Sequence, residues 1–244
     1  MCYKFKNGHN KMKQLPLKIF LTSLLSLASI SANAEFIKGD WLHENDNLSF
    51  VDTETGLEWL SLRKTIGMSI DEVKGKLDSQ FVGWRLPTEK EVIQVINGFT
   101  PFDYEGRDGF WSYNNDQIQS EVDEILHYFG VTQYFSTANS SLGTHLLDDG
   151  TVGHSGASSY HKASYYDRIY QAKYFYDDSD FSSANYGVFL VSDGGATLAS
   201  KENPEINAAN PNSPLNISDV PSESGIIGLG LALLGLRARE HFKF

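Results

Sequence analysis

Apolar and polar positions repeat with two different periods between Glu35 and Asp193, which predicts one domain of mixed helices and strands. Leu48 to Asp52 alternates between apolar and polar residues, as a half-buried strand does. A turn follows at Thr53 to Gly56, and a second apolar stretch runs from Leu57 to Leu60. This order predicts a β-hairpin.

Later segments also have the pattern of strands. Thr144 to Leu147 and the pair Thr151-Val152 flank an Asp-Asp-Gly turn, which is typical of a hairpin. Tyr170 to Tyr176 is rich in aromatic residues, which favours a strand. Gly187 to Val191 is a continuous apolar run, short enough for a central strand.

Helical periodicity occurs in three segments. Ser69 to Glu72 and Thr88 to Glu91 are capping boxes, in which a hydroxyl and a glutamate bond to each other's backbone at a helix start. A third helix is expected from about Gln117 to Phe129, with Gly130 as its stop. The face of the first helix that should be buried holds Ile70, Val73, Leu77 and Phe81. The predicted fold class is α+β, with a small, mostly antiparallel sheet and two or three helices.

The first 34 residues have the pattern of a secretory signal. Lysines precede an apolar run from Ile19 to Ile30, and the small residues Ala32 and Ala34 follow, so we expect cleavage after Ala34. The run has no polar face, which argues against an amphipathic helix. Translation from Met12 would give a signal of more usual length than translation from Met1, and both starts stay open.

The end of the chain has the pattern of a short membrane anchor. Gly225 to Leu236 holds twelve uncharged residues, and Arg237 and Arg239 follow. A helix of that length rises about 18 Å, against roughly 30 Å of bilayer hydrocarbon, so it is too short for a comfortable span. Residues 220–244 are expected to form a sorting or anchor segment with a short apolar helix, the alternative being a helix packed on the domain. The small and polar residues from Gly194 to Asp219 predict a flexible linker before it.

The two ends together resemble those of PEP-CTERM proteins, an exported class of Gram-negative bacteria. The positions that carry the resemblance are Val220, Pro221 and the segment from Gly225 to Arg239, whereas Ser222-Glu223-Ser224 departs from the commoner Glu-Pro-Ser. The resemblance implies export by the Sec translocon and signal peptidase, then recognition by an exosortase, a membrane transpeptidase that removes the tail. Cleavage and lasting anchorage of the tail are both open at this point.

Charge and cysteine content narrow the function classes. The formal net charge is −11, and it falls to −16 without residues 1–34, which carry five lysines and no acid. A basic nucleic-acid footprint is therefore absent from the composition. The one cysteine, Cys2, lies in the signal, so the mature chain would have no disulfide, thiolate metal site or cysteine nucleophile.

Three segments of the middle resemble an extracellular bacterial domain of unknown function that is frequent in PEP-CTERM proteins. They are Asp52 to Leu60, which contains TGLEWL; Gly83 to Thr88, which reads GWRLPT; and Asn185 to Val191. The resemblance implies a C-type-lectin-like fold over residues 35–193, related to that of formylglycine-generating enzymes, and it implies no catalytic activity. The copper-binding cysteines of those enzymes have no counterpart in the mature chain.

Candidate binding residues lie in the second half of the domain. Asp177, Asp178 and Asp180, with Asp148 and Asp149 as further contributors, form an acidic set that suits calcium, although the EF-hand spacing is missing. A solvated acidic loop is the alternative, and no other cofactor is expected. The tyrosine-rich stretch from Tyr160 to Tyr176 is interpreted equally as sheet structure or as a ligand surface, for which Tyr165, Tyr166 and Tyr170 are the candidates.

Other reactive side chains are interpreted as structural. Trp59 and Trp84 are expected in the core, and Arg85 is expected to pair with Glu89, Glu91 or Asp52. His154 and His161 are expected at the surface of a Gly/Ser/Tyr-rich loop. Ser155 lacks the G-x-S-x-G spacing of a nucleophile elbow and is interpreted as loop material.

The sequence thus favours a non-catalytic module that is exported through the inner membrane to the cell surface or extracellular matrix. Its expected partners are the export and sorting machinery and an extracellular polysaccharide, with no nucleic acid. A secreted hydrolase with a site in the His/Ser/Tyr-rich region and a purely structural biofilm matrix protein are the alternatives.

Overall fold

The computed structural model describes residues 35–100, 111–112, 118–160, 167–174 and 178–218. All of these residues belong to the unit that spans residues 34–244. The cleavage residues Ala32 and Ala34, the sorting motif from Val220 to Ser224 and the two terminal helices lie outside the described residues.

A four-stranded sheet contains the predicted hairpin. Its strands are β1 (Phe36–Gly39), β2 (Ser49–Asp52), β3 (Leu57–Leu60) and β10 (Val191–Ser192), in the order β1-β2-β3-β10. All three pairings are antiparallel, and β2 pairs with β3 from Ser49 opposite Leu60 to Asp52 opposite Leu57. Gly56 ends the turn with a φ of 68°, a left-handed conformation that glycine adopts without strain. The hairpin prediction is confirmed.

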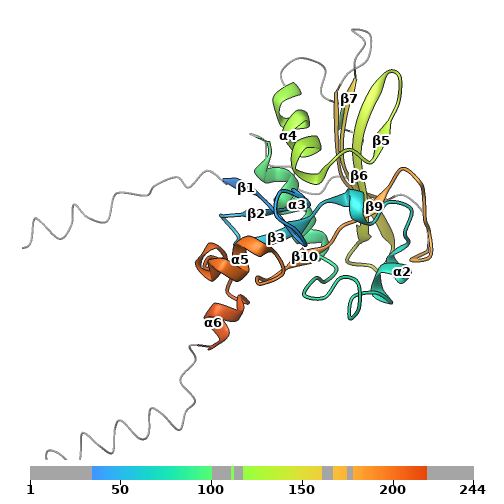
Figure 1. Ribbon diagram of the computed structural model, residues 1–244. Helices are drawn as coiled ribbons and strands as arrows, with labels where there is room; N and C mark the ends of the chain where they lie inside the picture. Colours follow the sequence, from blue (N-terminus) through green and yellow to red (C-terminus); the bar gives the residue numbers. More distant parts are fainter. Residues whose placement is uncertain (1–34, 101–110, 113–117, 161–166, 175–177, 219–244) are drawn as a thin grey trace, which may run out of the picture. The chain divides into compact units, whose positions relative to one another are not determined.

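The larger of the two sheets has six strands (Figure 1). It consists of β4 (Trp111–Ser112), β5 (Gln133–Tyr134), β6 (Ala138–Leu146), β7 (Val152–Tyr160), β8 (Arg168–Tyr174) and β9 (Gly187–Val188). The order is β4-β8-β7-β6-β5, and β9 pairs in parallel with β6 while the other pairs are antiparallel. The hairpin expected around residues 148–150 is present, with strands longer than the sequence predicted.

The apolar run at residues 187–191 does not form one central strand. Its first two residues form β9 in the six-stranded sheet, and Val191 begins β10 in the four-stranded sheet. Phe189 and Leu190, between them, have no exposed surface. The run is apolar throughout because it crosses between the cores of two sheets.

Helices begin at both predicted capping boxes. α2 (Ile70–Lys74) has the reciprocal Ser69–Glu72 bonds, and α3 (Glu89–Gly98) has the matching pair Thr88–Glu91. α2 is shorter than expected, because turns replace the helix after Gly75, although Ile70, Val73 and Phe81 are still buried. The third helix, α4 (Gln119–Phe129), ends at Gly130 as predicted. A 3₁₀ turn, η2 (Leu62–Lys64), follows β3.

One core cluster connects α3 and α4 with both sheets. It contains Val95 and Ile125 from the helices, Trp59 from β3 and Ala157 from β7. Phe50 and Phe129 meet edge-on at 4.9 Å between ring centroids. Trp59 is 1% exposed and Trp84, in the second core cluster, is 4% exposed, so the prediction that both belong to the core is confirmed.

Residues 194–218 form part of the fold, whereas the sequence predicted a flexible linker from Gly194 to Asp219. They contain α5 (Leu198–Glu202), η3 (Pro204–Asn207) and α6 (Pro214–Ser218). The carboxylate of Glu58, which is fully buried, accepts the Ala196 N–H at 2.9 Å and the Thr197 hydroxyl at 2.6 Å. We call residues 194–218 the C-terminal belt. Buried polar side chains of the belt, such as Thr197 and Asn207, bond to the domain instead of to water, which composition does not reveal.

The described fold is α+β with antiparallel pairing dominant, as expected, but it has two sheets and five α-helices in place of one sheet and two or three helices. Within the described ranges, none of the helices has the length and apolar character needed to cross a membrane.

Candidate functional site

The two faces of the six-stranded sheet differ in what covers them. Side chains alternate between the faces along each strand. Ala157 on β7 and Ile169 on β8 face α3 and α4, with which they share a core cluster. Their neighbours Ser158 and Tyr170 therefore face away from α3 and α4, toward the side that we call the groove face. At the far end of this face, Val152 shares a core cluster with Ile70 and Val73 of α2.

A groove of about 360 Å³ lies on this face and gives it its name. That volume falls near the lower end of the range for small-molecule sites. The described residues that line it come from β5 to β8 and the β5–β6 connection: Gln133, Phe135, Thr137, Ala138, Ser140, Leu142, Ser158, Tyr160 and Tyr170. The groove thus combines three aromatic rings, three Ser or Thr hydroxyls and one amide. The first and last of these residues, Gln133 and Tyr170, are 37 positions apart in the sequence.

The aromatic residues present ring surface at the groove. Phe135 is 55% exposed, and Tyr160 and Tyr170 are half-buried. The backbone N–H of Tyr160 donates to Asp167 at 2.7 Å, which holds the base of this hairpin. The Arg168 guanidinium lies 5.5 Å from the centre of the Tyr160 ring. Tyr134 is 74% exposed but does not line the groove, since it alternates with Gln133 on β5.

The polar floor of the groove is built from neighbouring strands. Ser140 on β6 is directly opposite Ser158 on β7, and their hydroxyl oxygens are 2.8 Å apart. Both side chains are buried. One hydroxyl proton is used in the bond between them, so the pair keeps a second proton for another acceptor.

Beside the groove, His154 joins an aromatic cluster. Its ring centroid is 5.7 Å from that of Tyr170 and 5.9 Å from that of Tyr186. His154 is 4% exposed and belongs to β7, so its expected place on a surface loop is wrong. The small residues around it pack within a sheet, which is why the composition resembled that of a loop. His161 lies outside the described residues.

His145 lies on the other face of the sheet from His154. Thr144, not His145, is directly opposite His154, and the His145 ring packs edge-on against Phe189 at 5.9 Å. Neither ring nitrogen of His145 has a hydrogen-bond partner among the described residues. Burial, and to a smaller extent the nearby His154, lower the pKa of His145 to about 3.

Ser155 is fully buried and is part of β7, not of a loop. As the next residue to His154 on the same strand, it points to the opposite face of the sheet. The described residues thus do not bring His154 and Ser155 together as a base and a nucleophile.

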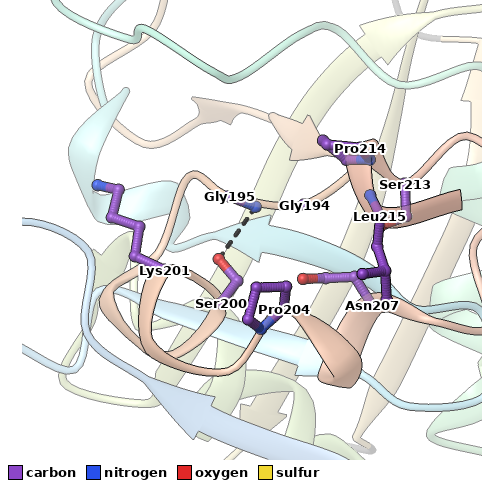
Figure 2. A pocket seen from close by; sticks show the side chains of 9 residues that line it. All are labelled: Gly194, Gly195, Ser200, Lys201, Pro204, Asn207, Ser213, Pro214 and Leu215. Atoms are coloured by element: carbon purple, nitrogen blue, oxygen red, sulfur yellow. Dashed lines mark hydrogen bonds between the residues drawn. The ribbon is translucent and has the colours of Figure 1, made fainter. Parts of the chain in front are cut away.

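A second hollow, of about 210 Å³, lies in the C-terminal belt. Figure 2 shows that it is walled by Pro204, Pro214 and Leu215, with Asn207 turned toward it. The Asn207 amide nitrogen donates to the Gly56 carbonyl at 2.8 Å, and the Gly195 N–H donates to the Ser200 hydroxyl at 3.0 Å. These polar groups hold the belt together, and the hollow is smaller than the groove and lacks an aromatic ring among its described residues.

Arg85, in the GWRLPT segment, forms ion pairs with Glu91 on α3 and with Asp193, which follows β10. Its guanidinium donates twice to Asp193, both at 2.9 Å, and twice to Glu91, at 3.0 and 2.7 Å. The predicted pairing with Glu91 is confirmed, but Asp193 was missed, and Glu89 and Asp52 make other contacts. The hydrogen bonds from Arg85 hold the pKa of Asp193 below its usual range. Asn210 of the belt also donates to Asp193, at 3.1 Å.

Ser179, which lies between Asp178 and Asp180 of the acidic set, bonds to α2. The Ser179 hydroxyl donates to Asp71 at 2.7 Å, while Asp178 and Asp180 are exposed. Asp149 is occupied locally, because it accepts from the Thr151 N–H and hydroxyl. No three His, Cys, Asp or Glu side chains of the described residues are grouped as metal ligands. Asp177, the third predicted ligand, lies outside them, as do Tyr165 and Tyr166.

Of the predicted ligand surface, the structure describes Tyr170, which is both a β8 residue and part of the groove lining. The sequence missed Phe135, Gln133 and the Ser140–Ser158 pair. The sequence does contain a signal for the serine pair, in the Asn-Ser-Ser run of β6 and the Ala-Ser-Ser run of β7. Because these runs are polar, the sequence pattern did not predict them as strands.

Comparison with known proteins adds no relative: neither a protein-family model, nor a curated protein, nor a solved structure matches this chain.

Proposed function

We propose that the chain is a non-catalytic, exported module that binds carbohydrate in the groove that faces away from α3 and α4. The observation that carries the proposal is the combination of exposed aromatic ring surface with hydroxyl and amide groups in one groove. A sugar ring has an apolar C–H face, which stacks on an aromatic ring, and a rim of hydroxyls, which exchange hydrogen bonds with neutral polar side chains.

The chemical groups that line the groove suit this use. Phe135, from the β5–β6 connection, and Tyr170, from β8, supply ring surface. Ser140 and Ser158 supply hydroxyls at the floor of the groove. Tyrosine and phenylalanine lose little conformational entropy on binding, since each has only two side-chain torsions.

Export and attachment are proposed from the sequence. The signal pattern that ends at Ala34 and the tail from Val220 to Phe244 support delivery by the Sec translocon and sorting by an exosortase-type transpeptidase, to the cell surface or matrix. The GWRLPT and TGLEWL segments support a C-type-lectin-like domain.

Binding of oligosaccharides to the full chain, in a zwitterionic detergent without a sugar head group, tests the groove. We expect Phe135→Ala and Tyr170→Ala each to weaken binding by about tenfold or more, as for central aromatic contacts. Tyr134→Ala is the matched control, because Tyr134 is more exposed than Phe135 but faces away from the groove. Equal losses in all three variants, or oligosaccharide binding that none of them changes, would contradict the proposal.

A further inference from the structure

The groove's described lining is chemically uniform. All nine lining residues that the structure describes are uncharged, and their polar groups are hydroxyls, one amide and the phenols of Tyr160 and Tyr170. Such groups match the hydroxyls of a neutral sugar. A carboxylate placed against them would lose water without gaining a paired charge, which is costly.

The floor of the groove suits a ligand hydroxyl in particular. The Ser140–Ser158 pair offers a second proton and free lone pairs, so it can donate to one ligand oxygen and accept from a ligand hydroxyl. A carboxylate accepts but does not donate, and it would leave part of this capacity unused.

The negative charge of the whole chain also disfavours an anionic ligand. The net charge is −11, and the exposed Asp178 and Asp180 contribute to it. An acidic surface lowers the local concentration of polyanions and slows their association.

The Arg168 guanidinium is the one described charge near the groove that would favour an anionic ligand. It lies against the ring of Tyr160, a lining residue, but is not itself part of the described lining. Its place opposite Ser158 on β8 puts it on the same face of the sheet as the groove, where it packs on Tyr160, so Arg168→Gln is included in the test below.

We infer that the ligand is a neutral polysaccharide segment, held by aromatic stacking and hydroxyl bonds, and not a uronate or other anionic glycan. The inference rests on the proposed function and specifies its substrate class. It also predicts binding that is insensitive to chelators and nearly independent of salt, because the described contacts are neutral.

The test compares oligosaccharides of equal length by calorimetry with the full chain. One set contains glucose, mannose, galactose and N-acetylglucosamine oligomers, and the other contains mannuronate and galacturonate oligomers. We expect a neutral oligomer to bind at least tenfold more tightly than any uronate, with Kd changing less than twofold between 20 and 300 mM NaCl or on addition of EDTA. Ser158→Ala should weaken that binding several-fold, and Ser159→Ala, on the opposite face, should not.

Three outcomes would overturn the inference: uronate binding as tight as neutral binding, uronate binding that is lost at high salt or in Arg168→Gln, and neutral binding that EDTA abolishes. These outcomes leave the proposed carbohydrate function standing. The absence of binding to both sets would instead refute the proposed function, and this inference with it.

Discussion

The groove and the C-terminal belt are both rich in small polar residues, yet they use them in opposite ways. In the belt, Thr197 turns inward to the buried Glu58, and Asn207 turns to the Gly56 carbonyl. In the groove, Ser140 and Ser158 bond to each other on the face that points away from α3 and α4. Polar composition therefore does not distinguish a structural strap from a binding surface; the partner of each polar group does.

Removal of the belt should have the largest effect. A protein that ends at Asp193 would deprive the Glu58 carboxylate of its two donors, Ala196 and Thr197, and of the belt residues that contact it. Breaking the partners of a buried charge costs about 3 kcal/mol or more, a large part of the stability of a domain of this size. We expect it to be unfolded by circular dichroism, while a protein that ends at Ser218 stays folded. A cooperative unfolding transition in the shorter protein would show that the belt is the flexible linker that the sequence predicted.

A single hydroxyl should reproduce part of this loss. Thr197→Val removes the 2.6 Å bond to Glu58 and keeps the side-chain shape, so we expect a loss of about 1.5–3 kcal/mol in urea denaturation, as for hydrogen bonds to charged groups. Oligosaccharide affinity at a temperature where the variant is folded should not change. A change in affinity without a loss of stability would reverse the roles assigned to belt and groove.

His145, a buried residue of β6, should make the free energy of unfolding depend on pH. His145 has a pKa of about 3 in the native state, against 6.5 for the free side chain. Between these values the unfolded chain binds a proton that the native chain does not, so stability is complete above pH 6.5 and falls as the pH is lowered, by about 1.4 kcal/mol per unit. His145→Leu should flatten that part of the profile.

Urea denaturation at pH 7 and pH 5 measures this effect, which amounts to about 2 kcal/mol for a single group with this shift. His43→Gln is the control, because the His43 side chain is exposed. An identical pH dependence in the wild-type chain and in His145→Leu would mean that the pKa of His145 is the same in the native and the unfolded chain.

Local signals predicted the parts of the fold that depend on local bonds. The capping boxes at Ser69 and Thr88, the turn at Gly56 and the stop at Gly130 each involve residues within one turn or hairpin. The belt and the Arg85–Asp193 bond depend on partners more than 100 residues away, and no local pattern encodes them. The length of β6 and β7 was missed for a related reason, since glycine and serine are poor strand formers that pairing alone holds extended.

The same distinction explains why Tyr170 was found and Phe135 was not. Tyr170 lies in a stretch of tyrosines that attracts attention by composition, whereas Phe135 follows a two-residue strand and becomes part of a site only through the pairing of β5 with β6. A site formed by register across strands is visible only after the register is known.

Phe135→Ala should have the smallest effect on stability and so gives the sharpest contrast with the belt. The side chain is 55% exposed and belongs to neither core cluster, so its removal should change the free energy of unfolding by no more than about 0.5 kcal/mol. Oligosaccharide affinity should nevertheless fall, because the ring surface that stacks is lost. A loss of stability as large as that of Thr197→Val would mean that Phe135 packs over the Ser140–Ser158 floor and stabilises the fold. The groove residues would then have a structural role, as those of the belt do.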